Sequence, residues 1–359
     1  MIITNDFPPR IGGIESFVRE VCGLLDDDVV VYTSGSDDRE RPYPVIRDGN
    51  LLLPTPRVRD RAVQLFADHG CRRVVFGAAA PLGLLAPALR RAGATRIVGL
   101  THGHETWWAT LPGSRRLLHR IGEGCDHLTT ISAYTRRRIA PALSSAARDR
   151  LLQLAPPVDT GAFRPPDAQA YRDGPPRCIA VGRFVAQKGF STLLLAWRRV
   201  VDRLADAELV LVGDGPRRAA LQNSIATLGL RDCVRLTGPL PRERVIAELQ
   251  QADVFALPVR TRLAGLNPEG LGLAALEAAA CGLPVIVGRS GGAPETVRPG
   301  RTGFVVEPGD DQELAVRLAA VLGNRSQAQA MGAAGRAFVV EQFGLAAARA
   351  TLRDALQLG

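Results

Sequence analysis

The stretch from Glu269 to Glu277 reads Glu-Gly-Leu-Gly-Leu-Ala-Ala-Leu-Glu and sets two carboxylates around a glycine-rich turn. It follows a buried-strand pattern at 254–257, and Gly270 and Gly272 let the backbone pass close to a ligand before a helix starts. Free amides at a helix start form an anion site. If the stretch were helical throughout, the two Glu Cα atoms would lie roughly 12 Å apart. That spacing suits two ends of an extended ligand better than glycoside hydrolysis, whose carboxylates lie about 5 to 10 Å apart. The alternative is an ordinary helix N-terminus with one favourable Glu and one exposed Glu.

Lys188 is the second candidate, because it is the only lysine among 45 basic residues. A single Lys in an Arg-rich chain calls for a site-specific reason, and a compact ammonium suits a phosphate. Lys188 and Arg183 fall on the loop between a strand pattern at 178–181 and a helix pattern at 190–204. Ligands bind at such strand-to-helix loops in parallel sheets. The alternative is a surface lysine that persists by chance.

A third candidate lies at the start of the chain. A strand pattern at 2–4 leads to Gly12-Gly13, and apolar residues at helical spacing follow over 14–25. This arrangement places backbone amides at a phosphate. Two glycines are weaker than a full dinucleotide fingerprint, and no acidic residue closes the next strand, so an NAD site is disfavoured.

Two histidines, His102 and His104, follow the strand pattern at 97–100. Zinc is conceivable, but no third ligand is nearby in sequence and no cysteine pairs with them. We therefore expect His104 to contact a sugar, and the alternative is a histidine satisfied by loop backbone. The run Asp26–Asp28 is similar to a metal-binding Asp-x-Asp, but its place at a helix-to-strand turn indicates a solvated turn. No metal or cofactor is expected.

Strands and helices alternate along both halves, which predicts an α/β chain with two doubly wound parallel sheets. A length of 359 residues suits two domains of ordinary size. A proline-rich linker at 156–166 sets the boundary, giving domains 1–157 and 158–341. We expect the last segment, 342–359, to form a helix that returns to the first domain.

Composition narrows the class of protein. No apolar run is long enough to span a bilayer, no leader is apparent and residue 1 falls in a strand pattern, so a cytoplasmic location is expected. Six scattered cysteines indicate reduced core residues. The net charge of +9 is spread over both halves and aromatic residues are few, which disfavours nucleic acid as a partner. A mild surplus of positive charge fits binding to an anionic membrane surface, although solubility alone would explain this charge.

Together, the Arg-x4-Lys loop, the Glu-x7-Glu element and a Gly-Gly-x-Pro-Glu turn at 291–295 resemble glycosyltransferase family 4. The resemblance runs essentially end to end. It implies a retaining, nucleotide-sugar-dependent enzyme of GT-B fold, in which two Rossmann-like domains face an interdomain cleft. Within the family, the chain resembles actinobacterial GDP-mannose-dependent phosphatidylinositol monomannoside mannosyltransferases. The stretches that carry this second resemblance are Thr4–Arg10, Phe76–Leu82, Thr101–Glu105, Arg260–Arg262 and Ser290–Val297.

The resemblance also implies roles for individual residues. Arg183 and Lys188 would hold the donor diphosphate and neutralise the leaving GDP, Glu269 would bind mannose hydroxyls, Glu277 ribose hydroxyls, and His104 the transferred sugar. Of these, Arg183, Lys188, Glu269 and His104 are the expected catalytic residues. The remaining implied contacts are donor contacts at Gly13, Leu240, Gly270, Leu271, Gly272 and Leu273, and acceptor contacts at Asp6 and Arg10.

The expected reaction is transfer of mannose from GDP-mannose to a phosphatidylinositol mannoside, a glycolipid, at the inner face of the cytoplasmic membrane. A loop at 263–268 is bulkier than in related mannosyltransferases, so another nucleotide sugar with a soluble or secondary-metabolite acceptor remains an alternative. A further alternative is a GT-B-type epimerase or a nucleotide-sugar-binding protein. An epimerase should need acid–base carboxylates near the sugar carbon, and only Glu269 is placed for that.

Overall fold

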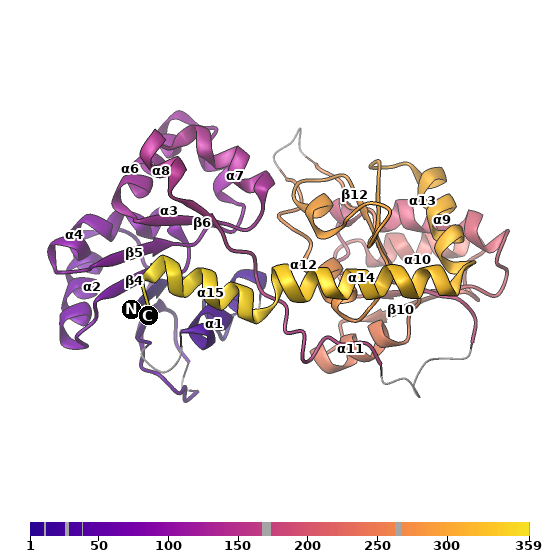
Figure 1. The fold of residues 1–359 in the computed structure, drawn as a ribbon, viewed down its shortest axis with the longest axis horizontal. Helices are drawn as coiled ribbons and strands as arrows, with labels where there is room; N and C mark the ends of the chain where they lie inside the picture. Colours follow the sequence, from indigo (N-terminus) through magenta and orange to yellow (C-terminus); the bar gives the residue numbers. More distant parts are fainter. Residues whose placement is uncertain (11, 26–28, 38, 167–173, 263–266, 359) are drawn as a thin grey trace. The chain divides into compact units, whose positions relative to one another are not determined.

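The computed structural model describes all residues of the chain except 11, 26–28, 38, 167–173, 263–266 and 359. The chain forms two compact units (Figure 1). Unit 1 comprises Met1–Pro157 together with Leu345–Gly359, and unit 2 comprises Val158–Gly344. In the described residues, no helix combines the length and apolar character needed to cross a membrane.

Unit 1 is built on a seven-stranded sheet with the order β3-β2-β1-β4-β5-β6-β7, and every pairing is parallel. Alternate side chains of its strands enter two different hydrophobic clusters. Ile3 and Phe76 pack on one face, and Ile2 and Val75 on the other. Both faces are therefore covered, as the apolar runs of a parallel sheet require. The strands are β1 (Ile2–Thr4), β2 (Val31–Ser34), β3 (Val45–Asp48), β4 (Arg73–Phe76), β5 (Arg96–Gly99), β6 (His127–Thr130) and β7 (Leu151–Gln153).

The helices of unit 1 connect these strands. Residues 79–91 form three short helical segments rather than one helix, and Pro87 lacks the N–H group that a continuous helix needs there. The helical segments are α1 (Gly13–Leu24), α2 (Pro56–Asp68), α3 (Ala79–Leu82), η1 (Gly83–Leu85), α4 (Ala86–Arg91), α5 (Glu105–Trp108), α6 (Pro112–Gly124), α7 (Ala133–Ile139), η2 (Ala140–Ala142), α8 (Ser145–Asp149) and α15 (Leu345–Leu356).

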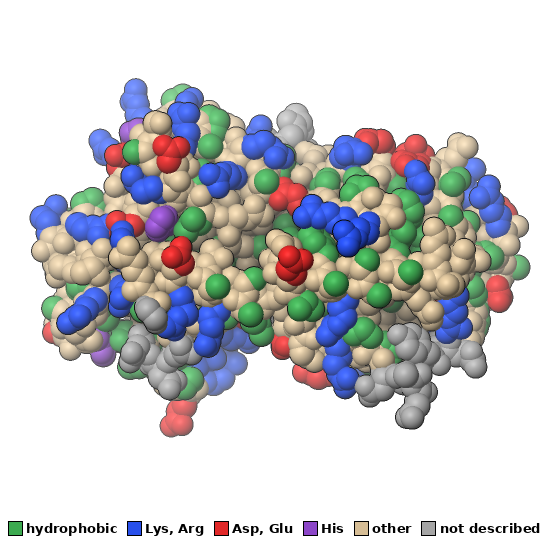
Figure 2. All heavy atoms as spheres, in the orientation of Figure 1, with side chains coloured by type: hydrophobic (Ala, Val, Ile, Leu, Met, Phe, Trp, Pro, Cys, Tyr) green, Lys and Arg blue, Asp and Glu red, His purple; other side chains and the backbone are tan. Residues whose placement is uncertain are grey.

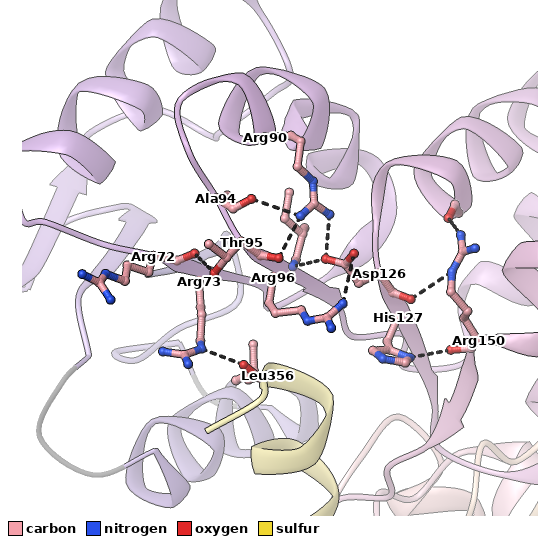
Figure 3. Close-up of polar contacts among 12 residues, drawn as sticks. Arg72, Arg73, Arg90, Ala94, Thr95, Arg96, Asp126, His127, Arg150 and Leu356 are labelled. Atoms are coloured by element: carbon pink, nitrogen blue, oxygen red, sulfur yellow. Dashed lines mark hydrogen bonds and ion pairs between the residues drawn. The ribbon is translucent and has the colours of Figure 1, made fainter. Parts of the chain in front are cut away.

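Helix α15 belongs to unit 1 through packing and through its C-terminal carbonyls. Leu352 and Leu356 are buried in the cluster that contains α1. Arg73 Nε donates to Leu356 O at 2.6 Å (Figure 3). Arg73 Nη2 donates to Gln357 O at 2.7 Å. A guanidinium at the last turn satisfies carbonyls that have no helical partner and interacts favourably with the helix dipole.

Asp126 ties together the ends of β5 and β6 in the same region (Figure 3). Its Oδ2 accepts from Ile97 N at 2.7 Å and from Arg90 Nη2 at 2.6 Å, and its Oδ1 lies 3.6 Å from Arg96 Nη1. The arginines around Asp126 therefore stabilise the fold of unit 1.

Unit 2 repeats the design with a six-stranded parallel sheet of order β10-β9-β8-β11-β12-β13. Its strands are β8 (Arg177–Val181), β9 (Glu208–Val212), β10 (Val234–Gly238), β11 (Val254–Leu257), β12 (Val285–Gly288) and β13 (Gly303–Val306). Its helical segments include η4 (Ala186–Lys188), α9 (Phe190–Val201), α10 (Arg218–Thr227), α11 (Arg242–Gln250), α12 (Leu273–Ala280), η6 (Ala293–Thr296), α13 (Asp311–Leu322) and α14 (Arg325–Phe343).

The strand order of unit 2 reverses between β8 and β11. From β8 the chain builds outward through β9 and β10, and it then returns to the other side of β8 for β11, β12 and β13. Ligands of open α/β sheets bind outside the carboxyl ends of strands at such a switch point. The loops that follow β8, β11 and β12 are therefore where a ligand of unit 2 is expected.

Candidate functional site

Lys188 and Glu269 meet at this switch point. Lys188 ends the 3-10 turn η4 after β8, and Glu269 lies in the loop between β11 and α12. Lys188 Nζ donates to Glu269 Oε1 at 2.9 Å and to Oε2 at 2.8 Å. Both side chains are mostly buried, with 23% and 12% of their surface exposed. The two residues that the sequence singled out separately thus form one ion pair.

The loop that carries Lys188 is fastened to the loop that follows β11. Arg260 N donates to Gln187 O at 2.8 Å, and Arg260 Nε donates to Ala186 O at 3.0 Å. Gln187 Nε2 donates to Pro268 O at 2.8 Å, next to Glu269. These bonds join the segments on either side of the ion pair, so its geometry is set by hydrogen bonds to the backbone of both loops.

A glycine-containing turn after β12 holds the backbone of Glu269. Gly292 N donates to Glu269 O at 2.9 Å, and Ser290 Oγ accepts from Glu269 N at 3.4 Å. Gly291 has a φ of +57°, and a Cβ there would overlap the carbonyl of Glu269. The Gly-Gly-x-Pro-Glu turn therefore positions Glu269 by an approach that only glycine permits.

Arg183 follows β8 in the same unit. Its side chain is exposed, and its guanidinium has no hydrogen-bond or ion-pair partner among the residues that the structure describes. Phe184 N donates to Asp214 O at 2.8 Å, and Gly215, with a φ of +155°, lies directly against the backbone of Phe184. The turn after β9 thus fixes the backbone beside Arg183 while its guanidinium stays available.

The N-terminus of α12 lies directly beyond Glu269. The helix begins only at Leu273, and Gly272 has a φ of +105°, so the stretch from Glu269 to Glu277 is not helical throughout. The separation of roughly 12 Å assumed a continuous helix and does not apply to this stretch. The backbone amides at the start of α12 and the carboxylate of Glu269 nevertheless belong to the same turn.

The other expected donor residues of unit 2 are found on the same elements or after β10. Leu271 is buried, so it offers a ligand its backbone rather than its side chain. Gly270, Leu273 and Glu277 are partly exposed, and Glu277 is a residue of α12. Leu240 lies two residues beyond the end of β10, before α11, and is also partly exposed.

The histidine motif of unit 1 is organised by a buried carboxylate. Glu105 has no exposed surface, and its Oε2 accepts from His102 N at 3.0 Å and from Gly103 N at 3.1 Å. His104 Nε2 lies 3.3 Å from Glu105 Oε1. Glu105 therefore shapes the turn that presents His104, a role that the sequence analysis did not assign although the residue lies in the quoted motif.

The two histidines have different environments. His102 Nε2 contacts Gly77 O at 2.5 Å, and its ring lies edge-on to Phe17 with ring centroids 5.7 Å apart. Burial lowers the pKa of His102, so the neutral ring donates its Nε2–H to the carbonyl. The side chain of His104 remains 38% exposed. His102 is thus the histidine satisfied by backbone, and His104 is accessible to a ligand.

Gly13 is the first residue of α1, and a Cβ there would meet open space.

Asp6 follows β1 and is half-buried. Burial is the main cause that raises the pKa of its carboxyl, and the charge of Glu15 raises this pKa further. His102 and His104 act on Asp6 in the opposite sense. Arg10 is exposed and its Nη1 lies 3.5 Å from Asn5 O.

Some sequence predictions fall outside the described residues. The run Asp26–Asp28 and positions 263–266 of the loop after Arg262 belong to this group. Among the residues that the structure does describe, no group of three or more His, Cys, Asp or Glu side chains is placed to hold a metal ion.

Two family models match the chain in succession. Residues 11–161 match "Glycosyltransferase Family 4", and residues 166–338 match "Glycosyl transferases group 1". A GDP-mannose-dependent alpha-(1-6)-phosphatidylinositol monomannoside mannosyltransferase of Mycobacterium tuberculosis is 44% identical, over 99% of this chain and 97% of its own length. The protein of the same name from Mycolicibacterium smegmatis is 43% identical, over 96% and 94%. A relative from Corynebacterium glutamicum, named for a monoacylated form of the same acceptor, is 40% identical, over 96% and 93%.

Solved structures share the fold at low sequence identity. A sucrose-phosphate synthase from Thermosynechococcus elongatus has a TM-score of 0.77 at 22% identity and covers 99% of this chain and 98% of its own. Anabaena HepE, solved with UDP, has a TM-score of 0.79 at 18% identity and covers 99% of each chain. The prediction of two Rossmann-like parallel-sheet domains of GT-B type is thereby confirmed. With its full-length relatives at 40–44% identity, this chain belongs to glycosyltransferase family 4.

Proposed function

We propose that this glycosyltransferase transfers mannose from GDP-mannose to a phosphatidylinositol mannoside, with retention of configuration. The observation that carries the proposal is identity of 40–44% over nearly the whole chain to enzymes named for that donor and that acceptor. The ion pair between Lys188 and Glu269 supports the proposal, because it brings together a residue suited to binding phosphate and a residue suited to binding a sugar.

The cations of unit 2 are suited to a diphosphate. An ammonium has three N–H donors, and Lys188 uses two of them on Glu269, which leaves one for a phosphate oxygen. Arg183 has its full fork of donors available. The amides at the start of α12 add partial positive charge. Together these groups stabilise the negative charge that develops on the leaving GDP.

Glu269 is suited to sugar hydroxyls. Its carboxylate has about four lone-pair positions, and Lys188 occupies two, so two remain for hydroxyl donors. No side chain need act as a nucleophile, because the departing phosphate oxygen takes the proton of the acceptor hydroxyl on the face that the sugar leaves. Glu277 would hold the ribose hydroxyls, and the backbone near Leu240 the guanine.

Unit 1 would contribute the remaining contacts. In this proposal, the amide of Gly13 binds a donor phosphate, and His104 contacts the mannose. Asp6 and Arg10 bind the acceptor. The half-buried Asp6 carboxyl is a suitable acceptor for hydroxyls of a mannoside.

The acceptor lipid places the reaction at a membrane surface, so we propose a cytoplasmic protein that binds peripherally to the anionic inner face. The net charge of +9 supports attraction to such a surface. Nucleic acid is not a proposed partner. We also propose that transfer requires no metal ion, since Arg183, Lys188 and helix amides supply the positive charge that a metal would supply elsewhere.

The test is incubation of the purified protein with labelled GDP-mannose and phosphatidylinositol monomannoside dispersed in detergent, with and without EDTA. We expect release of GDP and a labelled dimannoside lipid, at equal rates in both samples. Turnover of a UDP-sugar without consumption of GDP-mannose would favour the soluble-acceptor alternative. Conversion of the nucleotide sugar without transfer would favour an epimerase. Loss of activity with EDTA would overturn the metal-free mechanism.

A further inference from the structure

The segment between β5 and β6 exposes a tryptophan and a leucine. Trp107 is 46% exposed and Leu111 is 54% exposed. The neighbouring Trp108 is partly buried against the core of unit 1, so α5 is anchored by one indole and presents the other to solvent. A large apolar side chain that folding leaves exposed beside a second one indicates a contact surface.

Helix α6 adds positive charge next to these two side chains. Its residues Arg115, Arg116, His119 and Arg120 are exposed, while Leu118 and Ile121 face the core. This spacing puts the basic residues on the outer face of the helix. None of the four has an acidic partner within ion-pair distance in the part of the chain that the structure describes.

A groove of about 490 Å³ extends this charge. Arg115, Arg116, His119 and Arg148 line it together with apolar and neutral residues, and no acidic residue lines it. Arg115 Nη2 donates to Pro141 O at 2.7 Å and Arg148 Nε to Leu143 O at 3.1 Å, which leaves their other N–H groups available. Figure 2 shows basic side chains with a few acidic ones among them over the region of α6 and α8.

We propose that the β5–α6 surface, made of Trp107, Leu111, Arg115, Arg116, His119 and Arg120, docks unit 1 onto an anionic phospholipid bilayer. Trp and Leu side chains enter the interface, where an indole finds both apolar and polar surroundings. The guanidinium groups bind lipid phosphates. The inference rests on the proposed function, which requires a lipid acceptor, and it assigns the membrane contact to one surface.

The location of the surface fits this role. Trp107 follows His104 by three residues, on the short helix that Glu105 begins. The turn that presents His104 is therefore continuous with the membrane-docking segment. Docking would hold the carboxyl end of β5 next to the layer in which the acceptor headgroup lies.

A second exposed apolar pair provides a contrast within unit 1. Leu51 and Leu53 are 55% and 47% exposed and precede α2. Two of the three arginines of α2 are paired with carboxylates, since Arg57 lies 3.4 Å from Asp48 and Arg59 lies 2.8 Å from Asp60. The third, Arg61, donates to the neutral Gln64. Charge complementarity to an anionic surface thus favours the β5–α6 surface over this one.

The test is co-sedimentation of the full chain with phosphatidylcholine vesicles, with and without phosphatidylglycerol. We expect binding only to the anionic vesicles, weakened by salt. The double variants Trp107→Ser/Leu111→Ser and Arg116→Gln/Arg120→Gln should each reduce the partition coefficient by about tenfold or more. The matched variants Leu51→Ser/Leu53→Ser and Arg57→Gln/Arg59→Gln should bind as the unchanged protein does.

Equal binding by the β5–α6 variants and the unchanged protein would overturn the proposal, as would a loss confined to the matched variants. Thermal unfolding and GDP-mannose affinity of each variant establish that the fold and the donor site are intact. Activity on detergent-dispersed acceptor is independent of the bilayer. A protein that transfers mannose in detergent but binds no anionic vesicle would therefore refute the docking surface alone, and one that binds vesicles but transfers no mannose would refute the proposed function alone.

Discussion

Lys188 Nζ binds both carboxylate oxygens of Glu269, at 2.9 and 2.8 Å, across 81 residues of sequence. The pair couples the group proposed for the donor phosphate to the group proposed for the donor sugar. Neither side chain is fully buried, so the contact is accessible to a ligand. A buried charge that loses its partner is costly, so each side chain holds the other in place.

Replacing Lys188 by Ala should weaken GDP-mannose binding by about 1 to 3 kcal/mol, because one charge-assisted bond to phosphate is lost. The turnover rate should fall as well, since negative charge on the leaving group is less well stabilised. Calorimetric titration with GDP and with GDP-mannose measures the first effect, and steady-state kinetics the second. Arg231→Ala, at an exposed site of the same unit, is the control for loss of a positive charge. Unchanged affinity of the Lys188 variant would remove this residue from the site.

Gly291→Ala should lower the turnover rate by more than its loss of folding stability explains. The added Cβ would overlap the carbonyl of Glu269 and displace the residue proposed to hold the sugar. The positive φ of +57° adds backbone strain, which costs about 1 to 3 kcal/mol. Gly309→Ala is the matched control, because Gly309 has a φ of +88° but open space around a Cβ. Equal kinetic effects of the two variants would show that strain alone, and not the position of Glu269, accounts for the loss.

Gly13→Ala should raise the KM for GDP-mannose by about tenfold while leaving the unfolding midpoint nearly unchanged, since a methyl group would block a phosphate approaching the amide. The structure has open space at that position, so the fold should tolerate the substitution. Gly23→Ala, in the same helix and also with open space, is the control. If Gly13→Ala left the KM at the unchanged value, the proposed phosphate contact at this amide would be wrong.

The alternation of strands, glycine turns and helices was predictable because each of these signals is local. Val254–Leu257 is a buried apolar run, and Gly12 and Gly270–Gly272 precede helices that begin at Gly13 and Leu273. The loops that carry Arg183, Lys188 and Glu269 were predictable for the same reason. Parallel strands place all their carboxyl ends at one edge of the sheet. The edge at which the ligand-binding loops lie can therefore be predicted without any knowledge of distant contacts.

Other features depend on contacts that the sequence pattern does not contain. Strand β3 has only half-buried residues and includes Arg47 and Asp48, so it has no apolar run to mark it. Strand β7 ends at Gln153, before the prolines of the linker, although the apolar residues continue through Leu154 and Ala155. The bonds from Gln187 to Pro268 and from Gly292 to Glu269 join loops far apart in sequence, and only the folded sheet brings them together.

The stability of unit 1 should fall as the pH drops below the ordinary histidine pKa of 6.5, because burial lowers the pKa of His102. The unfolded chain then binds a proton that the folded chain does not, so the free energy of unfolding decreases with decreasing pH. The slope contributed by one such group reaches at most about 1.4 kcal/mol per pH unit and ends below the folded pKa. Chemical unfolding followed between pH 8 and pH 5, on either side of the value at which unfolded histidine titrates, measures this slope.

In His102→Gln, an amide N–H replaces the Nε2–H that His102 directs at Gly77 O. The hydrogen bond is kept and the titration is removed, so the slope below the histidine pKa should decrease while stability at neutral pH changes little. An identical slope in the unchanged protein and in His102→Gln would mean that another group is responsible. In that case the neutral ring of His102, bonded to Gly77 O, would not account for the pH dependence of the stability of unit 1.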